Sequence, residues 1–159
     1  MKSFIANALC SIVILLTAMT ASGKTIPQMR ISVENSTNHV QTLAVQHFSN
    51  ILKKKLEKRI EVNFYPGAAL FRDQDVIRAL AQGKVEMAVP GTWHITKFVP
   101  SVGVFLMPMF YGRPSSDTYK VLESPIGKKI NQNIETSLDL KVFGRWIDLG
   151  HAHLFSISK

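Results

Sequence analysis

Polar side chains that could contact a small solute gather in three short segments of the chain, at residues 34–38, 67–72 and 91–94. Each segment directly follows an apolar run that has the pattern of a strand. If those strands are parallel, the segments meet at the carboxyl edge of one sheet, where α/β folds bind their ligands. The groups available there are two carboxylates, an amide, a guanidinium and an indole, supplied by Glu34, Asn35, Arg72, Asp73 and Trp93. The prediction is a binding site for a small polar solute.

Catalytic chemistry finds little support in the same residues. The chain has no Gly-rich phosphate loop, no GxSxG motif and no HExxH pair of zinc ligands. Asp73 and Asp75 lie two residues apart, but capping of a helix by Asp73 explains the pair better than acid–base catalysis does. We therefore predict a protein that is not an enzyme and that has no cofactor and no metal.

Two histidines keep one enzymatic alternative open. His151 and His153 alternate, as neighbours on one face of a strand do, and could share a metal ion. Two ligands without a third His or a carboxylate make a weak zinc site. A metal-dependent periplasmic hydrolase is thus the alternative, and metal analysis of the purified protein would separate it from a binding protein.

The elements that position these groups are clearest between residues 60 and 90. Residues 60–65 alternate apolar and polar side chains, which predicts a strand that Pro66-Gly67 ends. A helix should follow, with Asp73 as its N-cap and Gly83 at its C-terminus, and a second strand should run through residues 85–89. Strands that are joined by a single helix should lie parallel with a right-handed crossover.

The remaining elements extend this unit into an α/β fold with a mostly parallel sheet and helices on both faces. A strand is expected at 29–33 and a helix at 40–56 that is capped by Thr37 or Asn38, with His47 on its buried face. The very apolar run 102–111 contains Pro108 and predicts buried irregular structure. Further helices are expected at 116–122 and 126–138, and strands at 140–147 and 149–156.

The N-terminal residues 1–23 have the composition of a secretory signal peptide. Lys2 precedes an apolar stretch from Phe4 to Met19, and small residues follow it. We predict an exported, periplasmic protein. Its single cysteine, Cys10, lies within this segment, so the mature chain would use neither disulfides nor thiol chemistry.

The formal net charge of +8 allows a second alternative, a basic module that binds acidic surfaces. Lysines and an arginine crowd residues 53–59, but aromatic residues are absent from this run. A solvated C-terminal end of a helix, where the helix dipole favours cations, is the better interpretation, and no nucleic-acid partner is expected. A steep salt dependence of binding to an anionic matrix would favour the alternative.

Several motifs taken together resemble those of the solute receptors of TRAP transporters, the DctP family. Tyr65-Pro66 is followed by Leu70, an acidic start of a helix and Gly83. Residues 85–87 resemble the family's apolar–acidic–apolar strand, and residues 106–110 its LPFLF segment. Residues 126–129 and 145–150 resemble its later landmarks. The likeness covers nearly all of residues 24–159.

The resemblance implies the first lobe of a two-lobed, type II periplasmic binding protein. Such a receptor captures a small organic acid and delivers it to membrane permease subunits, with lobe closure supplying the affinity. The expected ligand-binding residues are Glu34, Asn35, Asp73 and Trp93, and Asp73 keeps the residue type of a family contact position. The expected organisation is a signal peptide at 1–23, the lobe at 24–148 and the start of a crossover at 149–159.

The sequence also departs from the family pattern. Family receptors are roughly twice as long, and their carboxylate-clamping Arg would lie beyond Lys159. Phe71 replaces a Gly, and His151, Ala152 or His153 replaces an Arg. The expectation is therefore an N-terminal part of a receptor that binds solute poorly by itself, because a guanidinium matches a carboxylate in a way that few other groups can.

Overall fold

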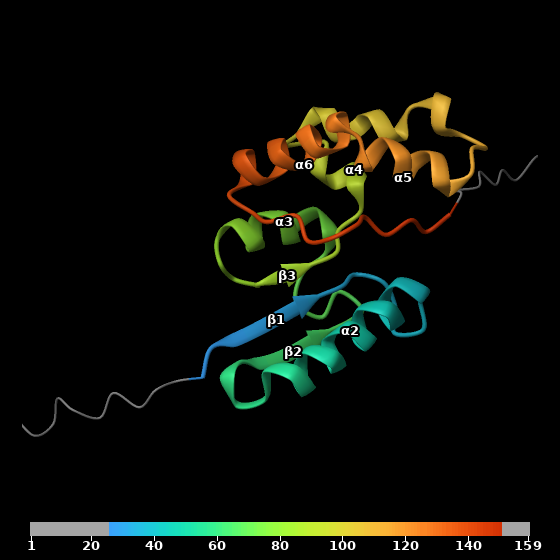
Figure 1. Ribbon diagram of the computed structural model, residues 1–159. Coiled ribbons are helices and arrows are strands. Elements are labelled where there is room, and N and C mark those ends of the chain that lie inside the picture. The colour runs from blue at the N-terminus through green and yellow to red at the C-terminus, as the bar shows by residue number, and fades with distance from the viewer. Residues whose placement is uncertain (1–25, 151–159) are drawn as a thin grey trace, which may run out of the picture.

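The computed structural model describes residues 26–150, in which a small parallel sheet carries helices on either side (Figure 1). The sheet consists of β1 (Gln28–Ser32), β2 (Glu61–Tyr65) and β3 (Met87–Ala88) in the order β2-β1-β3. Both outer strands run parallel to β1, with Ile31 paired to Phe64 on one side and to Met87 on the other. The predicted parallel α/β architecture is therefore confirmed.

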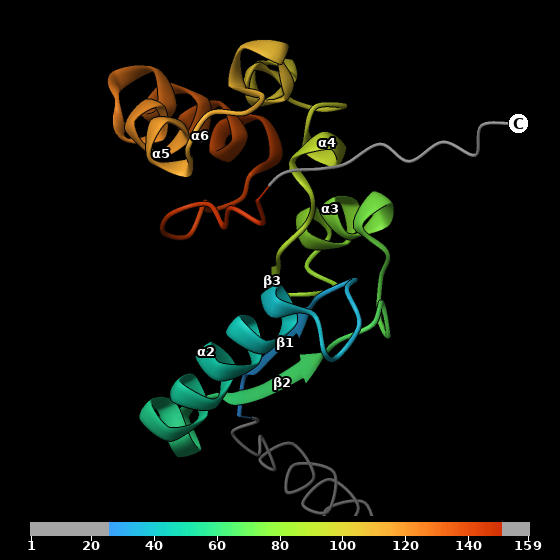
Figure 2. The same cartoon turned by 90° about the vertical axis from the view of Figure 1, so that its right-hand side faces the viewer.

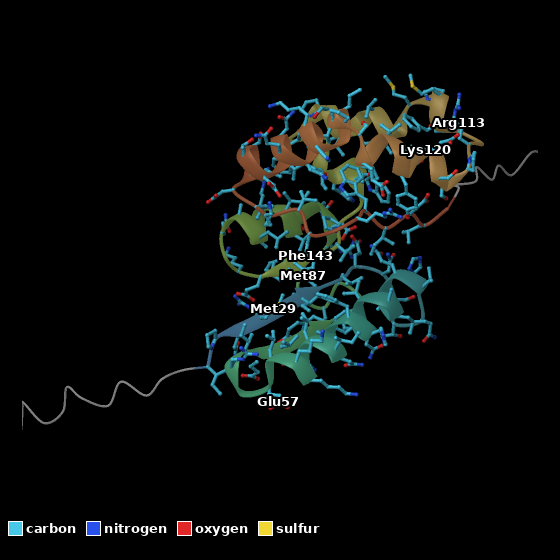
Figure 3. All side chains as sticks on the ribbon, in the orientation of Figure 1. Met29, Glu57, Met87, Arg113, Lys120 and Phe143 are labelled. Atoms are coloured by element: carbon cyan, nitrogen blue, oxygen red, sulfur yellow. The ribbon has the colours of Figure 1, made fainter. Side chains whose placement is uncertain are left out.

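The two faces of the sheet pack against separate cores. Ile31 and Val33 are buried with Val62, against Met29 and Met87 from the strands and against helix α2. Figure 3 labels Met29 and Met87 beside β1 and β3. Ala88 points the other way, into a core with Val76, Ile77 and Val85. Because successive side chains of a strand face opposite sides, the sheet has α2 on one face and α3 on the other.

Helix α2 (Val40–Leu56) lies alongside β1 and β2 (Figure 2). Its N-cap is His39, whose Nδ1 accepts the N–H of Gln41 at 3.2 Å, so the prediction of Thr37 or Asn38 as the cap is wrong. Three lysines occupy its last turn, as expected, and a 3₁₀ turn, η1 (Glu57–Arg59), follows.

The prediction for the buried face of α2 is only partly correct, because Leu52 and Leu56 pack against the core but other members of the apolar stripe do not. His47 is exposed, and so are Val40, Leu43 and Ile51, whereas Gln41, Thr42, Val45 and Ser49 are buried. The polar members of the buried face bind neighbouring loops, because Gln41 donates to the carbonyl of Val89 at 3.1 Å and Thr42 to that of Asn35 at 3.2 Å. These contacts rotate the helix away from its most apolar stripe.

Helix α3 (Asp73–Ala81) connects β2 with β3, as the sequence predicts. Its N-cap is Arg72 rather than Asp73, since Asp73 already has helical geometry. Gly83 has a φ of +65° after the helix, the left-handed conformation that only glycine adopts without strain. The second strand of the unit is shorter than predicted, although Val85 is buried just before it.

Beyond the sheet, the chain forms a layer of helices. It begins with α4 (Thr92–Ile95) and the 3₁₀ segments η2 (Pro100–Leu106) and η3 (Pro108–Phe110). The predicted irregular structure of 102–111 is thus confirmed, but its burial is only partial. Val102 is inaccessible to solvent, whereas Met109 and Tyr111 are 62% and 71% exposed.

Helices α5 (Ser115–Glu123) and α6 (Pro125–Leu138) complete this layer and confirm the two predicted helices. Ser124 separates them and caps α6, because its hydroxyl accepts the N–H of Gly127 at 3.4 Å. Ile130 and Ile134 of α6 pack with Val99 and Val102 in a third core.

Residues 140–147 have no regular secondary structure, so the predicted strand is not formed. The segment is held by α6 instead: the N–H of Val142 donates to Glu135 at 3.1 Å, and the indole of Trp146 donates to Asn131 at 3.0 Å. Phe143, labelled in Figure 3, contacts the ring of Phe48 on α2 at a centroid distance of 6.0 Å. Side-chain contacts to helices therefore replace pairing with another strand.

The predicted signal peptide, the His151–His153 pair and most of the 149–156 strand lie outside the described residues. Within 26–150, none of the helices is both long and apolar enough to cross a bilayer.

Candidate functional site

The three predicted loops do converge at the carboxyl edge of the sheet. Residues that follow β1 and β2 are tied together by backbone hydrogen bonds, in which Gly67 donates to Asn35 at 2.9 Å and Ala68 to Val33 at 3.1 Å. The loop after β3 leads into α4 and approaches the beginning of α3. Parallel pairing brings these loops to the same edge, because all the strands end on the same side.

Glu34 links the first loop to the N-terminus of α3. Its Oε2 accepts the N–H of Asp73 at 2.6 Å, which satisfies one of the free backbone donors in the first turn. The positive end of the helix dipole also favours a carboxylate at this position. Glu34, which is far from α3 in the sequence, therefore caps this helix, a role that the sequence predicts for Asp73.

Asp73 in turn links α3 to the third loop. Its Oδ2 accepts the N–H of Gly91 at 2.9 Å. Burial raises the pKa of the Asp73 carboxyl above its ordinary value, and the nearby Glu34 carboxylate acts in the same direction; the Gly91 hydrogen bond and His94 oppose them. The two carboxylates are thus held close together in a partly desolvated place.

His94 completes this cluster from α4. One ligand atom from each of Glu34, Asp73 and His94 lies within 4.8 Å of the other two. The Nδ1 atom of His94 is buried and has no hydrogen-bond partner among residues 26–150. We call these three residues the acid–histidine cluster. Its donor types, two carboxylates and an imidazole, can accept hydrogen bonds from a solute or coordinate a cation.

Trp93 forms the exposed margin of the same site. Its side chain is 56% exposed, and its ring lies 5.7 Å from the His94 ring between centroids. The indole also covers Gly91, where an added Cβ would fall 2.4 Å from the Cζ2 atom of Trp93. A glycine is therefore required at position 91 for this placement of the indole.

The other predicted site residues have different surroundings. The amide of Asn35 donates to Gln41 on α2, so its side chain fastens the first loop to that helix. Arg72 is exposed at the start of α3. Structure thus brings Glu34 and Asp73 together with Trp93 at the edge of the cluster, whereas Asn35 is turned toward α2.

Sequence reasoning missed two members of the site. His94 was placed in the third loop but was given no role, and the Gly91 N–H is a backbone donor that composition does not reveal. For His94, the available signal was a histidine in the loop that follows a strand.

An open groove of about 530 Å³ lies elsewhere, between the η2 segment and α6. Its walls are mainly apolar and include Val104, Ile126 and Ile130. The few polar groups there do not converge, so the acid–histidine cluster remains the better candidate for a polar ligand.

Comparison with known proteins finds related solute-binding proteins. A solute-binding protein of Verminephrobacter eiseniae is 28% identical over 137 residues, which make up 85% of this chain and 39% of the relative. A TRAP periplasmic solute-binding protein of Haemophilus influenzae, solved with bound L-gulonate, is 26% identical with a TM-score of 0.61. One of Sulfurospirillum deleyianum, solved with bound succinate, is 21% identical with a TM-score of 0.64.

Both solved structures match about 70% of this chain, and the chain spans only 36% of each. The family model for bacterial extracellular solute-binding protein, family 7 (DctP), matches residues 31–156. The chain therefore belongs to the DctP family of bacterial extracellular solute-binding proteins.

Proposed function

We propose that this chain contributes to the capture of a small organic acid in the periplasm and to its delivery to the membrane permease of a TRAP transporter. The observation that carries the proposal is the convergence of Glu34, Asp73, Gly91 and Trp93 at the carboxyl edge of a parallel sheet. Solved relatives hold succinate and L-gulonate, both of which are carboxylates.

Each group has a part in this proposal. Glu34 and Asp73 accept hydrogen bonds from hydroxyl groups of the solute, and the exposed face of Trp93 packs against its carbon chain. Asn35 contributes by holding the first loop through Gln41. Export through residues 1–23 would place the site in the periplasm. There the protein would carry the solute to the permease without reacting with it.

The proposal can be tested by NMR on the isotope-labelled chain, titrated with succinate and with L-gulonate. We expect saturable shifts of the backbone amides of Glu34, Asp73 and Gly91 and of the Trp93 indole N–H, with weak affinity. The site is open to solvent at Trp93, and an open site surrounds little of a ligand. L-gulonate, whose hydroxyl groups can donate to Glu34 and Asp73, should produce larger shifts than succinate, which has none.

A matched pair of variants sharpens this test. Trp93→Ala should weaken the response, whereas Tyr111→Ala removes another well-exposed aromatic ring and should leave it unchanged. Absence of any saturable shift with either acid, both with and without an added divalent metal ion, in a chain whose spectrum is dispersed, would refute the proposed function.

A further inference from the structure

The acid–histidine cluster has an unusual charge balance for a site that receives an organic acid. Glu34 and Asp73 place two carboxylates side by side, and each accepts a backbone N–H, from Asp73 and from Gly91 respectively. Within residues 26–150, neither carboxylate forms an ion pair with a lysine or arginine. As far as the described residues go, an anionic solute at this place would meet two carboxylates that no lysine or arginine pairs with.

The geometry is that of a three-donor cation site. The ligand atoms of Glu34, Asp73 and His94 lie within 4.8 Å of one another, and each side chain is only partly accessible. Donors that share a tetrahedral zinc ion at its usual bond lengths are about 3.4 Å apart. Side-chain rotations that shorten the separations between these ligand atoms to about 3.4 Å would let all three bind one ion.

A separate observation concerns the histidine. The Nδ1 atom of His94 is buried, and nothing in the described part of the chain forms a hydrogen bond with it, which is costly for a polar atom. The ring is held in place by its contact with Trp93 and by its position in α4. An imidazole combined with carboxylates favours zinc or another transition metal over magnesium or calcium, which prefer oxygen ligands alone.

We propose that Glu34, Asp73 and His94 bind one divalent transition-metal ion, whose open coordination position receives the carboxylate of the solute. The second half of this statement rests on the proposed function. Three protein ligands leave a fourth position free, as in zinc sites that bind an exogenous group. The ion would reverse the local charge and so supply the positive charge that an organic acid requires.

The first experiment titrates Zn²⁺ alone into the chelator-treated, untagged chain, followed by calorimetry. One ion should bind per chain, and Mg²⁺ and Ca²⁺ should bind far more weakly. His94→Ala and Asp73→Asn should each lower the affinity at least about tenfold, since even indirect disturbance of a metal ligand has effects of that size. Circular dichroism should show that both variants remain folded.

Other histidines provide the matched controls. His47→Ala removes an exposed histidine on α2, and the double change His151→Ala, His153→Ala removes the pair considered from the sequence. Both should retain Zn²⁺ binding. If the metal-site proposal is wrong, Zn²⁺ will fail to bind, or its binding will survive His94→Ala and be lost in a control.

The second experiment repeats the NMR titration with succinate in the presence and absence of Zn²⁺. Shifts that occur only with Zn²⁺ support the bridging role. Equal shifts in both conditions overturn that role but leave the proposed function standing. Shifts in neither condition refute the proposed function and the bridging role together, while the zinc titration decides the metal site independently.

Discussion

At the scale of single residues, the pair formed by Arg30 and Glu86 connects β1 to the turn before β3. The guanidinium donates to both carboxylate oxygens, at 2.6 and 3.0 Å, and Arg30 also donates its backbone N–H to Glu86 at 2.7 Å. A further hydrogen bond joins Arg30 to the carbonyl of Gly83 at 3.1 Å. Such two-pronged pairing is stronger than an ordinary surface ion pair.

We expect Glu86→Gln to lower the free energy of unfolding by about 1 kcal/mol at neutral pH, a modest value because both side chains are about one-third exposed. The hydrogen bond from Arg30 lowers the pKa of Glu86 below its ordinary value of 4.5. A lowered carboxyl pKa stabilises the folded state above that ordinary value, and the stabilisation is lost as the pH falls through the folded-state pKa. The difference between the two proteins should therefore shrink in acid.

Urea unfolding at a series of pH values measures this difference. Glu123→Gln is the control, because Glu123 pairs with Arg145 where both side chains are well exposed. Its effect should stay within a few tenths of a kcal/mol. A difference for Glu86→Gln that stays constant into acid would contradict the assigned role.

At the scale of elements, α5 and α6 approach each other closely at Gly127. A Cβ at this position would lie 2.1 Å from the carbonyl oxygen of Leu122, a distance that backbone atoms cannot tolerate. Gly127→Ala should therefore force the two helices apart and destabilise the protein by about 2 to 3 kcal/mol. Gly103→Ala is the matched control, because its Cβ would meet only Thr96 at 3.5 Å.

Thermal unfolding of both variants tests this contact. The midpoint should fall clearly for Gly127→Ala and little for Gly103→Ala. Equal midpoints for the two variants would mean that the junction between α5 and α6 can accommodate the added methyl group, contrary to this expectation.

A substitution in helix α2 should instead raise the stability of the protein. Ser49 is 1% exposed, and its hydroxyl has no hydrogen-bond partner among the residues that the structure describes. Ser49→Ala removes an unsatisfied buried group and adds helix propensity, so it should stabilise the protein by about 1 kcal/mol. Ser137→Ala, at an exposed position in α6, reports the propensity alone and should give only a few tenths. Chemical unfolding of both variants measures the two gains in the free energy of unfolding. If Ser49→Ala stabilises the protein no more than Ser137→Ala does, the buried hydroxyl does not destabilise the folded state.

These elements also show where sequence reasoning succeeds. The unit from β2 through α3 to β3 was predicted because alternation, a Pro-Gly turn and Gly83 are local signals that agree with one another. The residues Glu34 and Asp73 could be placed at one sheet edge for the same reason. Whether they bind solute stays a prediction.

The failures have a common cause in contacts between distant residues. The buried face of α2 depends on Gln41 reaching Val89, and the cap of α3 comes from Glu34, each far away in the chain. Residues 140–147 have the apolar content of a strand but are held by Glu135 and Asn131 of α6. Local patterns cannot reveal such partners, nor could they assign a role to His94.

At the scale of the whole molecule, apolar side chains remain on the surface of the helical layer. Leu106, Met107, Met109 and Tyr111 are each at least 41% exposed, and they lie along the segment from the end of η2 to the residue after η3. A concentrated set of exposed apolar groups favours association. The net charge of +8 opposes it, because like-charged molecules repel.

We therefore expect weak self-association that strengthens as salt screens the repulsion. Sedimentation velocity at rising protein concentration should show an increasing mean mass, more so at high salt. The double change Leu106→Lys, Met109→Lys should restore a monomer at every salt concentration, because it removes apolar area and adds charge at the same place. Val40→Lys adds a lysine at a position that is 67% exposed on α2, far from this segment in sequence, and should leave the association nearly unchanged. Equal suppression by Val40→Lys would show that net charge governs the association, and not the surface formed by η2 and η3.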